Sequence, residues 1–256
     1  MYNKNPTSEL YQSIEILYDY FNQSLFHNEL PNVLFTTQRQ NGMFGYFSAD
    51  RWTNTEGGKC HEIAINPLYV AKSTLIELMQ TLVHEMCHCW QYCYGKPSIK
   101  TYHNKEWSNK MKLLGLMPSS TGKPGGAMTG QCIADYPLPN GKFIADCERL
   151  MRDKKFKMPW LDVQASGIVC DSDEEKMEVL QQAFGGMDSE VVSQLTSSLN
   201  NLFNLNSDKL MNSSIATIKD NKRKRKYTCF ECGLNVWGKG GLSVICGECD
   251  LSLDEC

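Results

Sequence analysis

Residues 82–90 read Leu-Val-His-Glu-Met-Cys-His-Cys-Trp and contain the pattern H-E-x-x-H. Residues four apart lie on one face of a helix, so His84 and His88 can bind one metal ion. Imidazole nitrogens suit Zn²⁺, and Glu85, beside the first histidine, can accept a proton from a water on the metal. Apolar residues recur every three or four positions, which predicts a buried helix over residues 74–94. Because unliganded histidine and glutamate are costly to bury, the pattern favours a metal site.

A catalytic zinc ion takes three protein ligands and leaves one position open. Our predicted third ligand is His103, which follows the helix break at residues 95–97, where the chain can fold back. Glu106 is the alternative, because a carboxylate from a following helix can take the same place. Three neighbouring cysteines are expected to pack within the helices, with a ligand role for the first as a minor alternative: Cys87, Cys89 and Cys93.

A second metal-binding pattern lies near the C-terminus. Two C-x2-C pairs, thirteen residues apart, consist of Cys229, Cys232, Cys246 and Cys249. Each pair offers two thiolates, and two such pairs close a tetrahedral zinc site with no open position. This zinc is therefore expected to be structural, because a module of this size buries too little core to fold alone.

Composition and charge exclude several classes of protein. The chain has 256 residues, a net charge of -3 and no apolar run long enough to span a membrane. Its twelve cysteines would suit a disulfide-rich secreted protein, but the N-terminus lacks the apolar core of a signal peptide. We therefore expect a protein of a reducing interior, cytoplasmic, or nuclear if the source is eukaryotic.

The pattern of apolar residues and breakers predicts three parts. Residues 1–160 are expected to form one domain with a helix at 8–26, strands at 33–38, 44–48 and 60–66, the metal helix, a helix at 104–114, a strand at 131–136 and a helix at 143–151. Residues 161–221 are acidic and rich in serine and asparagine, which predicts a flexible linker with two weak helical patterns. Residues 222–256 hold the cysteine pairs as a zinc ribbon.

Five consecutive basic residues precede the ribbon: Lys222, Arg223, Lys224, Arg225 and Lys226. Such a run attracts phosphate and would make binding to nucleic acid depend on salt. A nuclear address and the solvated end of a linker are the alternatives.

The H-E-x-x-H pattern followed by His103, Trp107, Met111 and Gly115 resembles the SprT-like domain of Spartan-type metalloproteases. The segment 227–249 looks like the zinc ribbon of many bacterial and phage SprT-like proteins. Tyr102 and Asn104 flank His103, where the family often has glycines. The resemblance implies an α+β, zincin-type fold and His103 as a zinc ligand. It also implies possible action on proteins crosslinked to DNA.

The sequence therefore predicts a zinc peptidase with Glu85 as general base and two zinc ions, one catalytic and one structural. Residues 60–66 are the expected edge strand for pairing with a peptide substrate. Three residues are unranked candidates for stabilising the oxyanion: Tyr46, His61 and Tyr102. The rival hypotheses are a DNA- or partner-binding adaptor with two structural zinc sites, and a zinc hydrolase acting on a non-peptide substrate.

Overall fold

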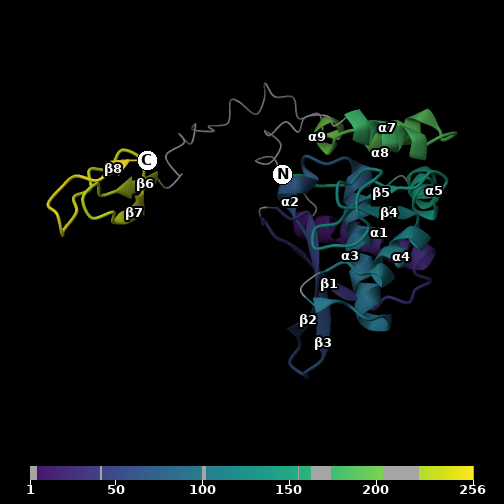
Figure 1. Ribbon diagram of the computed structural model, residues 1–256. Coiled ribbons are helices and arrows are strands. Elements are labelled where there is room, and N and C mark those ends of the chain that lie inside the picture. The colour runs from purple at the N-terminus through teal and green to yellow at the C-terminus, as the bar shows by residue number, and fades with distance from the viewer. Residues whose placement is uncertain are drawn as a thin grey trace. The chain divides into compact units, whose positions relative to one another are not determined.

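The computed structural model describes residues 5–40, 42–99, 102–154, 156–162, 174–203 and 225–255 (Figure 1). Two compact units divide the chain at residues 206 and 207. The first is a mixed α/β unit that contains the H-E-x-x-H pattern, and the second contains the cysteine pairs. Within the described ranges, the structure contains no helix that is both long and apolar enough to cross a membrane.

Two long helices form the core of the first unit. Helix α1 spans Pro6–Leu25 and α3 spans Leu75–Tyr94, which confirms the helices predicted at 8–26 and 74–94. At the start of α3, the Thr74 hydroxyl oxygen accepts from the Glu77 backbone N–H, and the Glu77 carboxylate accepts from the Thr74 backbone N–H. This capping box satisfies two N–H groups. The apolar stripes of α1 and α3 belong to one buried cluster.

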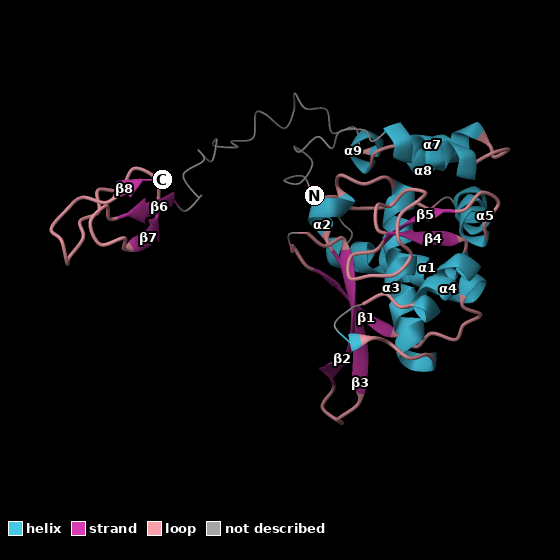
Figure 2. Cartoon of the chain, in the orientation of Figure 1, coloured by secondary structure: helices cyan, strands magenta, loops and turns pink. Residues whose placement is uncertain are grey.

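A three-stranded sheet packs against these helices. Strand β3 (Lys59–Ile65) is central, with β1 (Val33–Thr37) parallel on one side and β2 (Gly45–Thr53) antiparallel on the other. Ile63 and Ile65 are buried, and α3 contacts both β2 and β3 (Figure 2). The prediction that residues 60–66 form an edge strand is wrong, because β3 pairs with β1 on one side and with β2 on the other.

Shorter elements complete the first unit, before and after α3. Helix α2 is a single turn (Pro67–Val70), and α4 spans Lys105–Leu114 and ends at Gly115, whose φ of 93° is the left-handed conformation that favours glycine. Strands β4 (Leu116–Ser119) and β5 (Ala134–Pro137) pair antiparallel. Helix α5 (Lys142–Arg149) continues into a π-helical turn.

The predicted flexible linker is wrong for residues 174–203. This segment forms α7 (Glu174–Ala183), α8 (Ser189–Thr196) and α9 (Leu199–Leu202), which pack on the first unit (Figure 2). Its apolar side chains join the main core: Leu180, Ala183, Phe184, Val191, Leu195 and Leu199. The acidic, serine-rich composition predicted a linker because it outweighed these few apolar residues, although the two weak helical patterns coincide with the helices. Residues 163–173 and 204–224 lie outside the described part of the chain.

The second unit is a small β-ribbon. Strand β6 (Arg225–Thr228) lies between β7 (Asn235–Gly238) and β8 (Asp254–Glu255), and both pairings are antiparallel. Its buried cluster consists of Tyr227, Cys229, Cys246 and Leu253. So few apolar side chains provide little folding free energy, as the sequence predicted for a module that needs a metal.

Candidate metal centres

Three histidine side chains meet at one point of the first unit. His84 and His88 lie one turn apart on α3, and His103 precedes α4. The Nε2 atom of His103 lies 3.1 Å from Nε2 of His84 and 3.1 Å from Nε2 of His88. The structure thus brings together the three histidines that the sequence singled out.

Local hydrogen bonds explain why His103 reaches α3. Gly95 ends α3, and the side chain of Asn104 caps α4 by accepting from the Trp107 backbone N–H. The Gln91 amide of α3 donates to Asn104 Oδ1 at 2.7 Å, which joins the two helix ends. These contacts fold the chain back so that the residue before the cap faces the H-E-x-x-H pattern.

The donor set fits a zinc ion. Tetrahedral ligands at 2.0–2.1 Å from zinc lie about 3.3 Å from one another, close to the 3.1 Å between these nitrogens. Nitrogen lone pairs this close repel unless a proton or a metal ion lies between them. One proton can bridge only one of the two close nitrogen pairs, His103–His84 or His103–His88, whereas one metal ion can bind the Nε2 atoms of all three rings.

Trp107 forms the floor of this site. Its indole is fully buried, and its ring centroid lies 4.4 Å from that of His103, 4.7 Å from His84 and 5.1 Å from His88. It stacks on His88 with an interplanar angle of 22°. A rigid aromatic surface in contact with all three imidazoles restricts their tilt.

Electrostatics keep two of the histidines neutral. Burial and the neighbouring His84 lower the pKa of His88 well below its usual value, and the same causes lower the pKa of His103 to about 4. Burial alone would lower the pKa of His84, but the hydrogen bond to Asp135 and the charge of Glu85 raise it. Two imidazoles are therefore unprotonated at neutral pH, as metal binding requires.

Glu85 directly follows His84 and is buried. Its side chain is buried at the contact between α3 and β2, and burial raises its pKa. The backbone N–H of Phe47 on β2 donates to its carboxylate. A Cβ atom on Gly45 would lie 2.7 Å from the Ala64 carbonyl and 3.2 Å from Thr81, so glycine lets β2 approach α3 beside Glu85.

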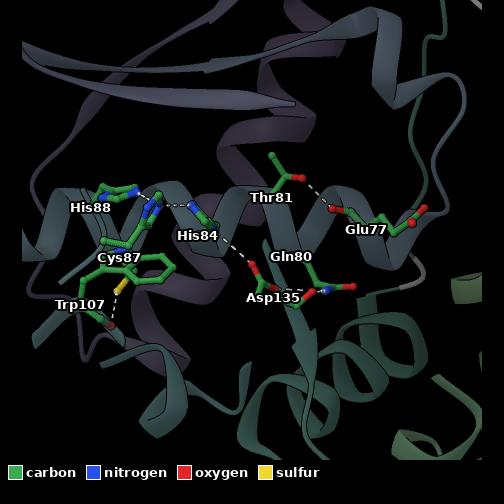
Figure 3. Close-up of polar contacts among 9 residues, drawn as sticks. Glu77, Gln80, Thr81, His84, Cys87, His88, Trp107 and Asp135 are labelled. Carbon is green, nitrogen blue, oxygen red and sulfur yellow. Dashed lines mark hydrogen bonds and ion pairs between the residues drawn. The ribbon is translucent and has the colours of Figure 1, made fainter. Parts of the chain in front are cut away.

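The other candidate ligands lie elsewhere. The Glu106 carboxylate accepts from the Gln91 amide and the Lys96 backbone N–H at the end of α3, so His103 rather than Glu106 completes the histidine group. Cys87 and Cys89 are buried, with Cys87 Sγ facing the Trp107 carbonyl, as expected for packing (Figure 3). Cys93 is exposed and faces His61, which differs from the buried position predicted for it.

Two of the three candidate oxyanion residues are engaged away from the histidines. The Tyr46 hydroxyl donates to Glu62, which is on the next strand. His61 Nδ1 accepts from the Asp50 backbone N–H. Tyr102, which directly precedes His103, is 41% exposed.

Two residues that the sequence did not identify as part of the site contact the histidines. Asp135 Oδ2 lies 3.0 Å from His84 Nδ1, and Trp107 packs under all three rings. Asp135 is 51 positions from its partner in sequence, so no spacing rule could find it. Trp107 read as an ordinary core residue of the predicted helix at 104–114.

The cysteine group of the second unit also fits zinc. The four Sγ atoms lie within 4.8 Å of one another, and Cys232 Sγ is 3.6 Å from Cys246 Sγ. Tetrahedral thiolates 2.3 Å from zinc are separated by about 3.8 Å. Backbone N–H groups of Cys232 and Glu231 lower the pKa of Cys229 to about 7, which favours its thiolate, whereas hydrogen bonds among the four thiols raise the pKa of Cys249 to about 12.

Replacing Trp107 with alanine is expected to destabilise the first unit by about 3–5 kcal/mol, because it empties a fully buried site. Denaturant unfolding of the full chain, followed by circular dichroism, measures this. Trp52→Ala is the matched control, since that indole is 42% exposed on β2 and its loss should cost far less. Equal losses in the two variants would show that Trp107 does not support the site.

Comparison with known proteins gives two matches. The sequence model of the SprT-like family matches residues 14–123. An uncharacterized protein in the mucB 3' region of Salmonella typhimurium is 45% identical over 53 residues, which cover 21% of this chain and 72% of that protein. No solved structure matches the chain.

Proposed function

Because the chain belongs to the SprT-like family, whose domains are of the zinc-dependent metalloprotease type, we propose that it is a zinc peptidase with a zincin-type site. The observation that carries this proposal is the convergence of three imidazole Nε2 atoms near the buried carboxylate of Glu85, which lies on α3 with two of the three histidines. His84, His88 and His103 would hold the catalytic zinc, and Cys229, Cys232, Cys246 and Cys249 the structural one.

The zinc ion, when bound, acts as a Lewis acid that makes water more acidic and polarises the carbonyl of a peptide bond. Glu85 is the general base: it accepts the proton of the attacking water and passes it to the nitrogen of the leaving amine. The Phe47 N–H orients the Glu85 carboxylate. Trp107 excludes water from beneath the rings.

Strand β2 is the best candidate for binding the substrate backbone. It lies at an edge of the described three-stranded sheet and contacts α3, the helix that carries Glu85. An extended peptide can pair with such an edge through main-chain hydrogen bonds. We therefore propose β2 in place of residues 60–66, because β3 is paired on both sides.

The direct test is hydrolysis of an unfolded protein, such as casein, by the full chain. Zinc-loaded protein should release peptides, a chelator should stop the reaction, and added zinc should restore it. Zinc-loaded protein that binds metal at the histidine site and cleaves no peptide bond would refute the peptidase proposal.

We further propose that the basic run at residues 222–226 holds the protein on nucleic acid, so that its substrates are proteins bound or crosslinked there. Lys222, Arg223 and Lys224 lie outside the described residues, whereas Arg225 and Lys226 begin β6. Lys226 lies directly opposite Trp237 in the β6–β7 ladder, and that indole is 62% exposed. An ammonium group next to an exposed aromatic ring supports contact with phosphates and bases.

If all five basic side chains at 222–226 contact phosphates, log Kd should change with log salt with a slope of about 4.5 for duplex and 3.5 for single-stranded DNA. Titration of fluorescent oligonucleotides across a salt series measures the slope. Replacing the five residues with glutamine should flatten it while leaving the ribbon intact. An unchanged affinity and slope would exclude this segment as the anchor.

A further inference from the structure

A short segment, Gly130 to Asp135, lies behind two of the three histidines. His103 and Gly130 exchange backbone hydrogen bonds of 2.8 and 3.1 Å, and His103 Nδ1 lies 3.1 Å from the Gly130 carbonyl. At the other end, the Asp135 carboxylate faces His84 Nδ1 at 3.0 Å. One segment, distant in sequence from α3, thus contacts the Nδ1 atoms of both His84 and His103.

These contacts fix which nitrogen of each ring carries the proton. A carbonyl and a carboxylate oxygen can only accept, so His84 and His103 must each donate from Nδ1. In the neutral rings, the Nε2 lone pairs then point toward the shared centre. The segment therefore selects the tautomer that can bind zinc through Nε2.

Asp135 is itself held firmly. Its side chain is 6% exposed, and its two oxygens have different partners: Oδ2 faces His84, and Oδ1 accepts from the Gln80 amide at 3.1 Å (Figure 3). Gln80 also donates to the Asp135 backbone carbonyl at 3.3 Å. Gln80 precedes His84 by one turn of α3, so the same helix face supplies both the metal-binding ring and the group that orients its partner.

We infer that Asp135 is a positioning residue that sets the zinc affinity of the histidine site through His84. The carboxylate holds the ring in the binding orientation and makes Nε2 a stronger donor to the metal. This inference rests on the proposed function only in assuming that the histidine site holds zinc. It assigns the control of affinity to a strand outside the H-E-x-x-H helix.

The test measures zinc affinity at both sites of the full chain by competition with a chromophoric chelator. Asp135→Ala should weaken binding at the histidine site by roughly 10–100-fold, the usual effect of removing such a partner. Asp135→Asn should weaken it less, because the amide oxygen can still accept from Nδ1. The cysteine site, in a separate unit, is the internal reference and should not change.

Asp162→Asn is the matched control. Its carboxylate is similarly buried, at 9% exposure, and pairs with Arg39 at 2.8 Å instead of a histidine. This variant should retain wild-type zinc affinity. Cobalt substituted at the histidine site gives a second readout, because its visible spectrum should change in both Asp135 variants and stay constant in the control.

Unchanged affinity in Asp135→Ala would overturn the inference and leave the peptidase proposal standing. Equal loss of affinity at both metal sites, or equal effects of Ala and Asn with a matching fall in the stability of the metal-free chain, would show a merely structural role and also overturn it. Asp135-dependent zinc binding without peptide hydrolysis would instead refute the peptidase and support the inference.

Discussion

A Glu85→Gln variant is expected to keep both zinc ions and to lose peptidase activity by about 10²–10⁴-fold. Glutamine matches the size of the buried glutamate, so packing between α3 and β2 is retained. Its amide cannot accept a proton from water at neutral pH, so the general base is absent. Initial rates on an unfolded protein, together with zinc content by elemental analysis, measure the two effects separately.

Glu106→Gln provides the control, because it makes the same chemical change on α4, where the Glu106 carboxylate accepts from Gln91 near the C-terminal end of α3. It should retain both zinc and activity. Wild-type turnover in Glu85→Gln would remove Glu85 from the mechanism. Loss of the histidine-site zinc in Glu106→Gln would instead restore Glu106 as a ligand in place of His103.

Changing Cys229 and Cys246 to serine is expected to unfold the ribbon. Structural zinc supplies about 10–16 kcal/mol of apparent free energy to modules of this kind. The ribbon's buried cluster, apart from the two cysteines themselves, is only Tyr227 and Leu253. Amide NMR should show loss of dispersion for residues 225–255 alone, and zinc content should fall from two ions per chain to one.

A double change of Cys60 and Cys93 to serine serves as the control, since both belong to the first unit and to neither metal-binding group. It should retain two zinc ions. A ribbon that stays folded without Cys229 and Cys246 would show that its apolar core suffices. Loss of both zinc ions in the variant that lacks Cys229 and Cys246 would show that the two sites are coupled.

The candidate metal ligands could be predicted because their chemistry appears in local spacing. H-E-x-x-H places two imidazoles on one helix face, and two C-x2-C pairs supply four thiolates. His103 required one further argument, the helix break at Gly95 that folds the chain back. The structure brings all seven of these side chains into two groups.

The supporting residues could not be predicted because they depend on long-range contacts. Asp135, which contacts His84, lies on β5, whose position depends on its pairing with β4. Strand β3 is central because β1 pairs with it in parallel. Composition also gave a wrong prediction for residues 174–203, where a few apolar side chains are enough to pack the helices on the core. Leu180 and Leu195 dock α7 and α8 on the core, although the surrounding sequence is acidic and polar.

Zinc X-ray absorption of the chain with Cys229 and Cys246 changed to serine reports on the histidine site alone, because only that site is then expected to hold metal. We expect three imidazole nitrogens and one additional oxygen at about 2.0–2.1 Å, with no sulfur. That shell has the open position that a hydrolase needs. A shell closed by four protein ligands, or one containing sulfur from Cys87, would exclude a hydrolytic zinc site and favour an adaptor whose zinc ions are both structural.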